Sequence, residues 1–350
     1  MNKSFWNTLS QPIIGLAPMD GVTDAAFRFI CDKYGHPSVL ITEFTSVEGI
    51  SHGVAKLLYS FIYHKTTTPT VAQIFGSNPE SFYKTAIVLC EMGFDGIDIN
   101  MGCPDKNVAK QGGGASLILK PDLAREIIKQ TKKGVSDWVE GKTIADAGLS
   151  ESIIDFVSRF QKQWNITPVK HMLPVSVKTR IGYDDIVTES WISNLLQENP
   201  AVITVHGRTL KQLYSGSANW DEIAKAAEIV RKTDTLILGN GDIKTMEDAK
   251  QKIATYHTHG ALIGRSTFGN PWLFIDEQTS LKQKMEVALE QCHAFMTYTP
   301  ELNFLILRKH LAWYCKGYND ATGMRAKLMS TTNIKEAEEA IREIIQTVSD

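Results

Sequence analysis

The chain has 350 residues, enough for one barrel of about 250 residues with a smaller module attached, or for two domains of ordinary size. Hydrophobic residues make up 43% of the chain and charged residues 22%, a globular composition that excludes a disordered or fibrous protein. The 37 basic and 39 acidic residues give a net charge of −2. This balance excludes a protein held to nucleic acid by bulk positive charge, but it allows a local basic patch.

Cysteine usage and the first residues of the chain both predict a cytoplasmic protein. The five cysteines are odd in number and form no CxxC pair, as expected in a reducing compartment. The opening residues, MNKSFWNTLSQPIIGLAPM, lack the charged-then-apolar layout of a signal peptide. No apolar run approaches the ~18 residues of a membrane span, so we expect no membrane partner.

Eight short apolar runs rich in β-branched residues predict eight buried strands. They lie at residues 13–17, 39–42, 70–74, 96–99, 174–178, 202–205, 235–238 and 260–263. Amphipathic stretches between them favour helices, for example at residues 81–92, 123–132 and 221–231. Continuous apolar runs suit strands covered on both faces, as in a parallel sheet. The pattern predicts an α/β fold of the TIM (β/α)8 barrel type, with a doubly wound open sheet as the alternative.

Two segments lie outside this repeat. Residues from about 134 to 172 exceed what one strand–helix unit needs and contain a helical pattern at 152–163, so we expect an insertion on the barrel. From about residue 277 the strand signals stop and the pattern is helical to residue 350. We therefore expect a barrel domain over residues 1–276 and an all-helical domain over residues 277–350.

Polar residues follow the predicted strands at their carboxyl ends, where a TIM barrel builds its active site. Such residues follow seven or eight strands in the same phase, which packing alone does not explain. They are Asp20, Glu43, Gln73, Asn100, Cys103, Lys178, Arg180, His206, Asn240, Asp242 and Arg265. Gly241, Gly264 and Arg265 follow the last two strands, where barrels often bind phosphate. The alternative for these glycines is a pair of tight turns.

The motifs in this barrel closely resemble those of the tRNA-dihydrouridine synthases, a family of flavin enzymes with a TIM barrel. In chain order they read APMDGVTD, QIFGSNPE, DINMGCP, VKTRIG, TVHGRT, GNGDI and IGRSTFGNPW. The resemblance spans residues 13 to about 275. It continues at residues 308–317, which resemble the RNA-binding helical domain of the bacterial B-type branch. It implies reduction of uridines in the D-loop of tRNA to 5,6-dihydrouridine, with FMN as cofactor and NADPH as reductant.

Cys103 is the catalytic residue that the resemblance implies. In the family, reduced flavin supplies a hydride to C6 of uracil, and a cysteine in the NMGCP motif donates a proton to C5. A thiol can act as this acid because its reference pKa of about 8.5 leaves it mostly protonated at neutral pH. A small buried hydrophobic residue is the alternative for a lone cysteine, and it is our interpretation of the other four.

The resemblance also implies a set of cofactor-binding residues. Lys178 matches the lysine near the flavin, where a cation stabilises charge on the reduced ring. His206 is expected to contact the flavin, with a core histidine as the alternative, and Arg180 to hold substrate or flavin. Asp20 is also expected among the cofactor-binding residues, although it departs from the small residue or Glu usual in the family. The remaining cofactor-binding residues are expected to be Pro18, Met19, Gln73, Asn100, Asn240, Gly241, Asp242, Gly264 and Arg265.

The helical tail carries a local excess of positive charge. Residues 308–327 contain five Lys or Arg and one acid. Basic residues with aromatics among them suit a structured RNA, so we expect RNA contacts from Arg308, Lys309, Trp313 and Lys316. A solvated helix face with a core stripe is the alternative.

Two other functions remain open from the sequence. A flavin-dependent reductase of free pyrimidines would have a similar barrel without needing the basic tail. A tRNA-binding chaperone without turnover would need the tail but not Cys103. We expect no metal site, since His257 and His259 have no further ligand beside them, and we expect a monomer.

Overall fold

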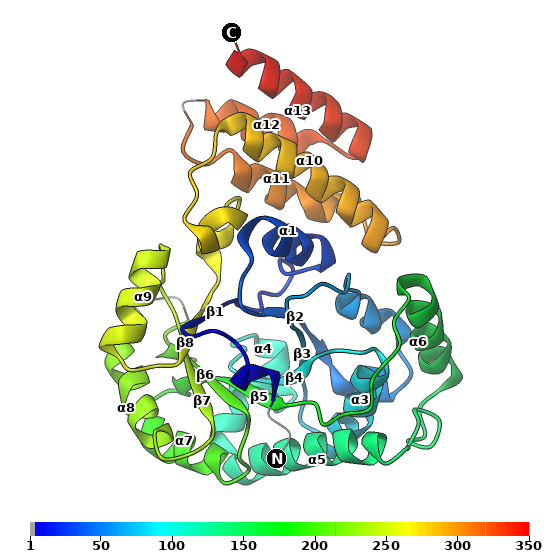
Figure 1. Ribbon diagram of the computed structural model, residues 1–350, viewed down its shortest axis with the longest axis vertical. Coiled ribbons are helices and arrows are strands. Elements are labelled where there is room, and N and C mark those ends of the chain that lie inside the picture. The colour runs from blue at the N-terminus through cyan, green and yellow to red at the C-terminus, as the bar shows by residue number, and fades with distance from the viewer. Residues whose placement is uncertain (1–3, 214, 319, 350) are drawn as a thin grey trace.

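Eight parallel strands close into a barrel in chain order, with the last strand paired to the first (Figure 1). The computed structural model describes residues 4–213, 215–318 and 320–349. The closed order confirms the predicted TIM barrel and excludes the open sheet. The strands are β1 (Ile13–Leu16), β2 (Leu40–Ser46), β3 (Thr70–Phe75), β4 (Gly96–Met101), β5 (Val175–Gly182), β6 (Val202–Thr209), β7 (Leu236–Asn240) and β8 (Gly260–Ile263).

Several strands run further at their carboxyl ends than the apolar runs predicted. β5 continues through Arg180 to Gly182, and β6 continues through His206 to Thr209. The pairing places Lys178 beside Asn100 and Arg180 beside His206. The polar residues that interrupt the apolar pattern therefore remain in the sheet and become neighbours across it.

Helices cover the outside of the barrel (Figure 1). Predicted helices at 81–92, 123–132 and 221–231 are confirmed as α3, α5 and α8. Side-chain caps fix several helix starts: Asn78 accepts from the Ser81 backbone N–H, and Asn219 from that of Glu222. The helices are α1 (Ala25–Gly35), α2 (Val47–Ser51), α3 (Pro79–Glu91), α4 (Lys106–Lys110), α5 (Pro121–Val139), α6 (Glu151–Trp164), α7 (Thr188–Leu196), α8 (Trp220–Val230) and α9 (Met246–Thr255).

The segment predicted as an insertion consists largely of one helix and two loops. Its helical pattern is confirmed as α6, whose Phe156 ring packs edge-on against Tyr59, with centroids 5.4 Å apart. The predicted start at 134 lies inside α5, which continues to Val139 because Val135 and Trp138 extend its buried face.

The helical tail packs on α1, the helix that follows the first barrel strand (Figure 1). It comprises α10 (Leu281–Tyr298), η6 (Phe304–Leu307), α11 (Arg308–Tyr314), α12 (Ala321–Ser330) and α13 (Ile334–Ser349). Glu290 of α10 accepts hydrogen bonds from Lys33 Nζ at 2.6 Å and Tyr34 Oη at 2.5 Å, both on α1. The barrel is linked to the tail by 3₁₀ turns η4 (Arg265–Thr267) and η5 (Pro271–Ile275).

None of the helices in the described ranges is both long and apolar enough to cross a membrane. The five cysteines are free thiols, and all are buried.

We predict that Tyr314→Phe destabilises the tail. Tyr314 is buried, and its hydroxyl donates to Gln291 Oε1 at 2.8 Å, while Gln291 Nε2 lies 2.9 Å from His310 Nδ1. Removing the hydroxyl leaves a buried amide oxygen without its donor, so the free energy of unfolding should fall by about 1–2 kcal/mol in urea titrations.

Tyr318→Phe is the matched control. The Tyr318 hydroxyl donates to the Thr279 carbonyl at 3.2 Å in a half-exposed position, where water can replace it. Its loss should cost less than about 0.5 kcal/mol. Equal losses in the two variants would contradict the role assigned to Tyr314.

Candidate functional site

A cavity of about 1740 Å³ opens at the carboxyl ends of the barrel strands. The predicted catalytic and cofactor-binding residues line it together, and so do Arg180 and Lys316. They are Pro18, Met19, Asp20, Gln73, Asn100, Cys103, Lys178, Arg180, His206, Asn240, Gly241, Asp242, Gly264, Arg265 and Lys316. Three residues predicted to contact RNA, Arg308, Lys309 and Trp313, lie outside its lining.

A buried hydrogen-bonded chain forms the floor of the cavity. Asn100 Nδ2 donates to Gln73 Oε1 at 3.0 Å, and Gln73 Nε2 donates to Asp98 Oδ2 at 2.7 Å. Ser176 Oγ donates to the other oxygen of Asp98 at 2.7 Å. Both amide orientations are thereby set by Asp98, which is 1% exposed. Asp98 was not among the predicted site residues. Its carboxylate inside an apolar strand could have indicated a buried polar role.

Lys178 lies among these groups as a partly buried amine that lines the cavity. Burial, together with the nearby Arg180 charge, lowers its pKa to about 8, although the Asp98 carboxylate acts in the opposite direction. Burial raises the pKa of Asp98 to about 6. At pH 7 both groups are therefore still charged, and a cation stands at the floor of the cavity.

Cys103 sits in a turn built by Asn100. Asn100 Oδ1 accepts from the backbone N–H groups of Gly102 at 3.0 Å and Cys103 at 2.8 Å. The thiol is 8% exposed and lines the cavity. Burial raises its pKa, and the carboxylates of Asp105 and Asp20 add to the shift. The thiol is therefore protonated at neutral pH.

Arg180, on β5, connects the Cys103 turn to the end of β6 through two hydrogen bonds. Its Nε donates to the Gly102 carbonyl at 2.6 Å, and its Nη1 donates to the Thr209 carbonyl at 3.1 Å. The guanidinium is buried and also lines the cavity. It can thus hold the Cys103 turn and present positive charge to a ligand.

His206 is a neutral histidine. Burial and the surrounding cations, first Lys178 and then Arg180, hold its pKa well below the usual range. Its Nε2 lies 3.2 Å from Arg208 Nη1. Since an arginine can only donate, Nε2 is the acceptor and Nδ1 carries the proton in this neutral form.

Asp242 links two arginines beside the last two strands. Its carboxylate accepts from Arg208 Nη2 at 2.5 Å, from the Ala218 N–H at 2.8 Å and from Arg265 Nη2 at 3.1 Å. Burial alone would raise its pKa, but these donors outweigh burial and lower it. A carboxylate cannot hold a phosphate directly, so this side chain positions the arginines. Arg208 belongs to the TVHGRT motif but was not among the predicted site residues. Because it lies two residues after His206, both side chains are on one face of the strand.

Two glycines in the backbone after β7 and β8, Gly241 and Gly264, line the cavity. Gly241 has a φ of +129°, and a β carbon there would lie 2.6 Å from Ala218 Cβ. A β carbon on Gly264 would lie 3.2 Å from Met19 Sδ. Asn240 Nδ2 braces these loops by donating to the Leu262 carbonyl at 2.8 Å. A side chain at either glycine would crowd the cradle beside Arg265.

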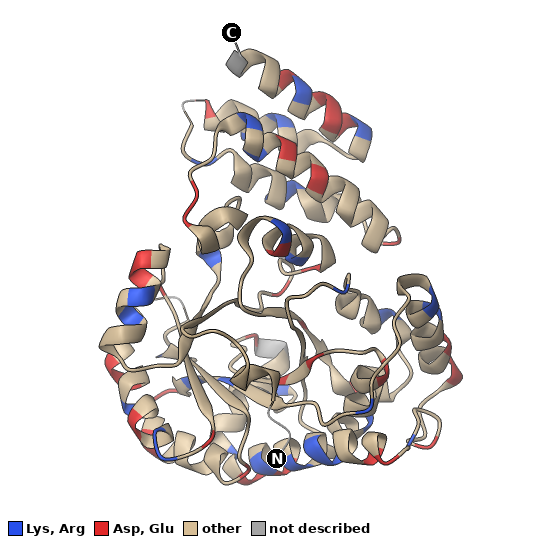
Figure 2. Ribbon diagram, in the orientation of Figure 1, with Lys and Arg blue, Asp and Glu red and all other residues tan. Residues whose placement is uncertain are grey.

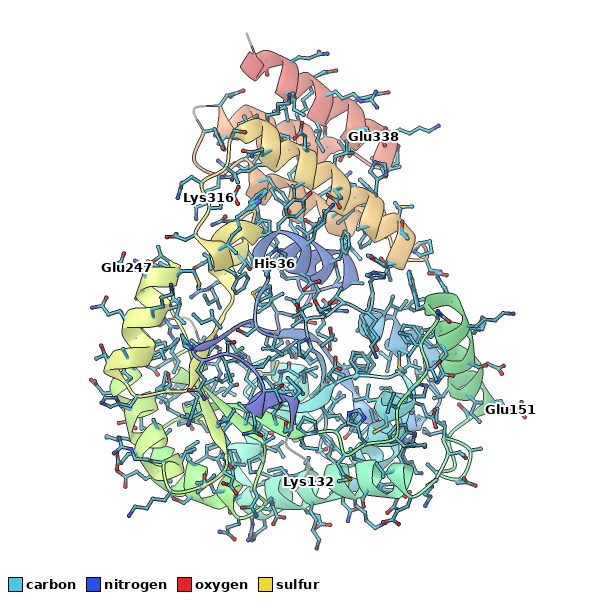
Figure 3. All side chains as sticks on the ribbon, in the orientation of Figure 1. His36, Lys132, Glu151, Glu247, Lys316 and Glu338 are labelled. Atoms are coloured by element: carbon cyan, nitrogen blue, oxygen red, sulfur yellow. The ribbon has the colours of Figure 1, made fainter. Side chains whose placement is uncertain are left out.

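The four residues predicted to contact RNA have different surroundings. Lys316 lines the cavity at the lower edge of the tail (Figure 3). Lys309 reaches the loop after β1, where a β carbon on Gly21 would lie 3.0 Å from its Nζ. Arg308 Nε instead donates to the Thr331 carbonyl at 2.6 Å within the tail, and the Trp313 ring stacks on Phe268. Elsewhere on the tail, α10 and α13 carry both signs of charge (Figure 2).

Among the described residues no group of three or more His, Cys, Asp or Glu side chains could hold a metal ion. His259 has a structural contact, since its Nδ1 accepts from the Ile237 backbone N–H at 3.1 Å.

Comparison with known proteins identifies the family. The family model described as "Dihydrouridine synthase (Dus)" matches residues 15–163 and 149–349. The "Probable tRNA-dihydrouridine synthase" of Staphylococcus aureus (strain COL) is 34% identical over 347 residues, covering 96% of this chain and 94% of that protein. The "Probable tRNA-dihydrouridine synthase 2" of Bacillus subtilis (strain 168) is 32% identical over 346 residues, covering 96% and 95%.

The chain therefore belongs to the dihydrouridine synthase family, as its motifs predicted, and the prediction of an enzyme of this family is confirmed. Among solved structures, dihydroorotate dehydrogenase (DHODH) of Eimeria tenella in complex with ferulenol matches with a TM-score of 0.48 and 15% identity, covering 82% of each chain. That likeness is too distant to carry an argument about function.

We predict that Lys178→Met stabilises the cofactor-free protein at pH 7. A lysine whose pKa falls from 10.5 to about 8 on folding opposes folding as long as it is protonated in the folded state, and stability rises with pH where the unfolded chain binds more protons. The destabilisation caused by Lys178 is at its full size below pH 8 and disappears as the pH rises to about 10.5. The variant should gain roughly 1–3 kcal/mol at pH 7 in urea titrations.

This gain should shrink when the same titrations are repeated at pH 9.5. Lys162→Met, at an exposed position of α6, is the control and should show no such pH dependence. A gain for Lys178→Met that is equal at both pH values would contradict the assignment of a partly buried, protonated amine.

Proposed function

We propose that this protein reduces the C5=C6 bond of uridines in the D-loop of tRNA to 5,6-dihydrouridine, using FMN as cofactor and NADPH as reductant. The observation that carries the proposal is the position of Cys103. A protonated thiol lines a barrel cavity whose floor holds Lys178 and two amides, Gln73 and Asn100. Membership of the dihydrouridine synthase family supports the same reaction.

The donor groups of the cavity fit FMN. Gln73 and Asn100 present neighbouring amides for the polar edge of the flavin ring, and Lys178 places a cation beside them. The open backbone at Gly241 and Gly264, with the exposed Arg265 guanidinium, suits the phosphate. Reduced FMN, when bound, supplies the hydride that adds to C6 of the uracil.

Cys103 supplies the proton that adds to C5. The thiol keeps this proton at neutral pH because burial raises its pKa, with Asp105 and Asp20 contributing. Asn100 holds the Cys103 turn from one side through its backbone N–H groups, and Arg180 holds it from the other through the Gly102 carbonyl. When the proton moves from Sγ to C5, the thiolate left behind faces the Lys178 and Arg180 charges and takes a new proton from water.

The features at the mouth of the cavity favour an RNA substrate over a free pyrimidine. Lys316 of the tail lines the cavity itself, and Lys309 reaches the loop after β1 beside Asp20. Two cations at the entrance suit phosphates that flank a base taken out of its stack. A reductase of free pyrimidines would gain nothing from either lysine.

We predict that Cys103→Ala binds and reduces FMN normally but does not form dihydrouridine. The substitution removes the proton donor and leaves the floor of the cavity and both glycine loops unchanged. General acid catalysis contributes on the order of 10²–10⁴-fold, so the rate of dihydrouridine formation should fall by at least about 100-fold. Cys90→Ala, which removes a buried thiol of α3 away from the cavity, is the control and should keep its activity.

The measurement is anaerobic mixing of the reduced protein with unmodified tRNA, followed by the flavin absorbance. The wild type should reoxidise with tRNA and not with free uracil, and Cys103→Ala should stay reduced. Full modification of tRNA by Cys103→Ala would remove the thiol from the mechanism. Reoxidation with free uracil alone would favour the free-pyrimidine reductase instead.

A further inference from the structure

The loop that follows β8 is held from outside the barrel by tail helix α11. The Trp313 indole stacks on the Phe268 ring, with centroids 4.0 Å apart and planes 11° from parallel. Directly after Phe268, the buried Gly269 has a φ of +64°, and a β carbon there would lie 2.4 Å from the Trp313 carbonyl group. The loop and the helix therefore pack ring against ring and backbone against backbone.

A single tight turn connects this contact to the open phosphate cradle. The backbone N–H of Thr267 donates to the Gly264 carbonyl at 2.9 Å, and that of Phe268 donates to the Arg265 carbonyl at 3.3 Å. Gly264, Arg265 and Phe268 all line the cavity. Because η4 has only one turn, a movement of Phe268 is passed directly to Gly264 and Arg265.

Helix α11 is itself fixed well enough to act as a support. Its His310 is buried, packs edge-on against Phe27 of α1 at 5.5 Å and lies 4.7 Å from the Trp313 ring. The buried Gln291 joins α10 to α11 through His310 and Tyr314. Trp313 is thus flanked by Phe268 and His310, and its stacked face is taken up by the Phe268 ring.

We propose that Trp313 is a positioning residue for the cofactor: its stack on Phe268 holds Gly264 and Arg265 in the arrangement that binds the FMN phosphate. The tail helices then complete the cofactor site as well as facing the RNA. This inference rests on the proposed function, because it takes FMN as the ligand of the cavity.

The test is the dissociation constant of FMN for the cofactor-free full-length protein, followed by flavin fluorescence. Trp313→Ala should raise this constant about tenfold, because a lost aromatic pair no longer fixes the loop. Trp313→Phe keeps a flat ring against Phe268 and should return to within about threefold of the wild type. Phe268→Ala combined with Trp313→Ala should be no worse than either single variant, since the two residues act through one contact.

Two further measurements separate positioning from a general loss of tail stability. Ile341→Ala opens a buried site in α13, which packs on α10 and α12; it should lower the melting temperature without changing FMN affinity. Amide hydrogen exchange at residues 264–270, measured without FMN, should speed up in Trp313→Ala and not in Ile341→Ala.

The outcomes are distinct. If Trp313→Ala binds FMN as the wild type does and only raises KM for tRNA, the inference is overturned and an RNA contact takes its place. If the wild type does not bind FMN at all, the proposed function is wrong, and the inference, which takes FMN as the ligand, is overturned as well. Weaker FMN binding in Ile341→Ala as well would reduce Trp313 to a general packing role and overturn the inference.

Discussion

The site depends on one buried carboxylate. Asp98 is hydrogen-bonded by Gln73 on one strand and Ser176 on another, and this fixes the amide orientation of Gln73. Gln73 in turn orients the amide of Asn100, and the oxygen of that amide accepts from the backbone of the turn that carries Cys103. An acid outside the cavity lining therefore helps to position the turn that carries the Cys103 thiol. Such a chain is effective because unpaired buried polar groups are costly, so its members have one arrangement that satisfies them all.

Charge is distributed unevenly across the cavity. Four cations, Lys178, Arg180, Arg208 and Arg265, gather near His206, and the carboxylates of Asp98 and Asp242 lie close to some of them. The same excess of positive charge keeps His206 neutral. The negative charge of Asp242 offsets the repulsion between the two arginines beside it, Arg208 and Arg265. The part of the cavity around His206 therefore suits a ligand group that brings negative charge.

The barrel and most of its lining could be predicted because both leave local signals. Buried parallel strands are apolar runs, and site residues interrupt those runs at their ends. Asp98 and Arg208 were missed because they act through neighbours on other strands. The tail was harder to interpret. Trp313 and Arg308 lie in a basic, aromatic segment, yet one packs on Phe268 and the other bonds to Thr331. Contacts between a seven-residue helix and a distant loop leave no periodic pattern to read.

The environment of Cys103 also has a consequence for oxidative damage. Peroxide attacks the thiolate rather than the thiol, so a cysteine whose pKa is raised reacts slowly. The other four cysteines are buried and outside the cavity lining, so no resolving thiol lines the cavity to rescue an oxidised Cys103 as a disulfide. The burial that raises the pKa of Cys103 and retains its proton therefore also protects the sulfur from oxidation.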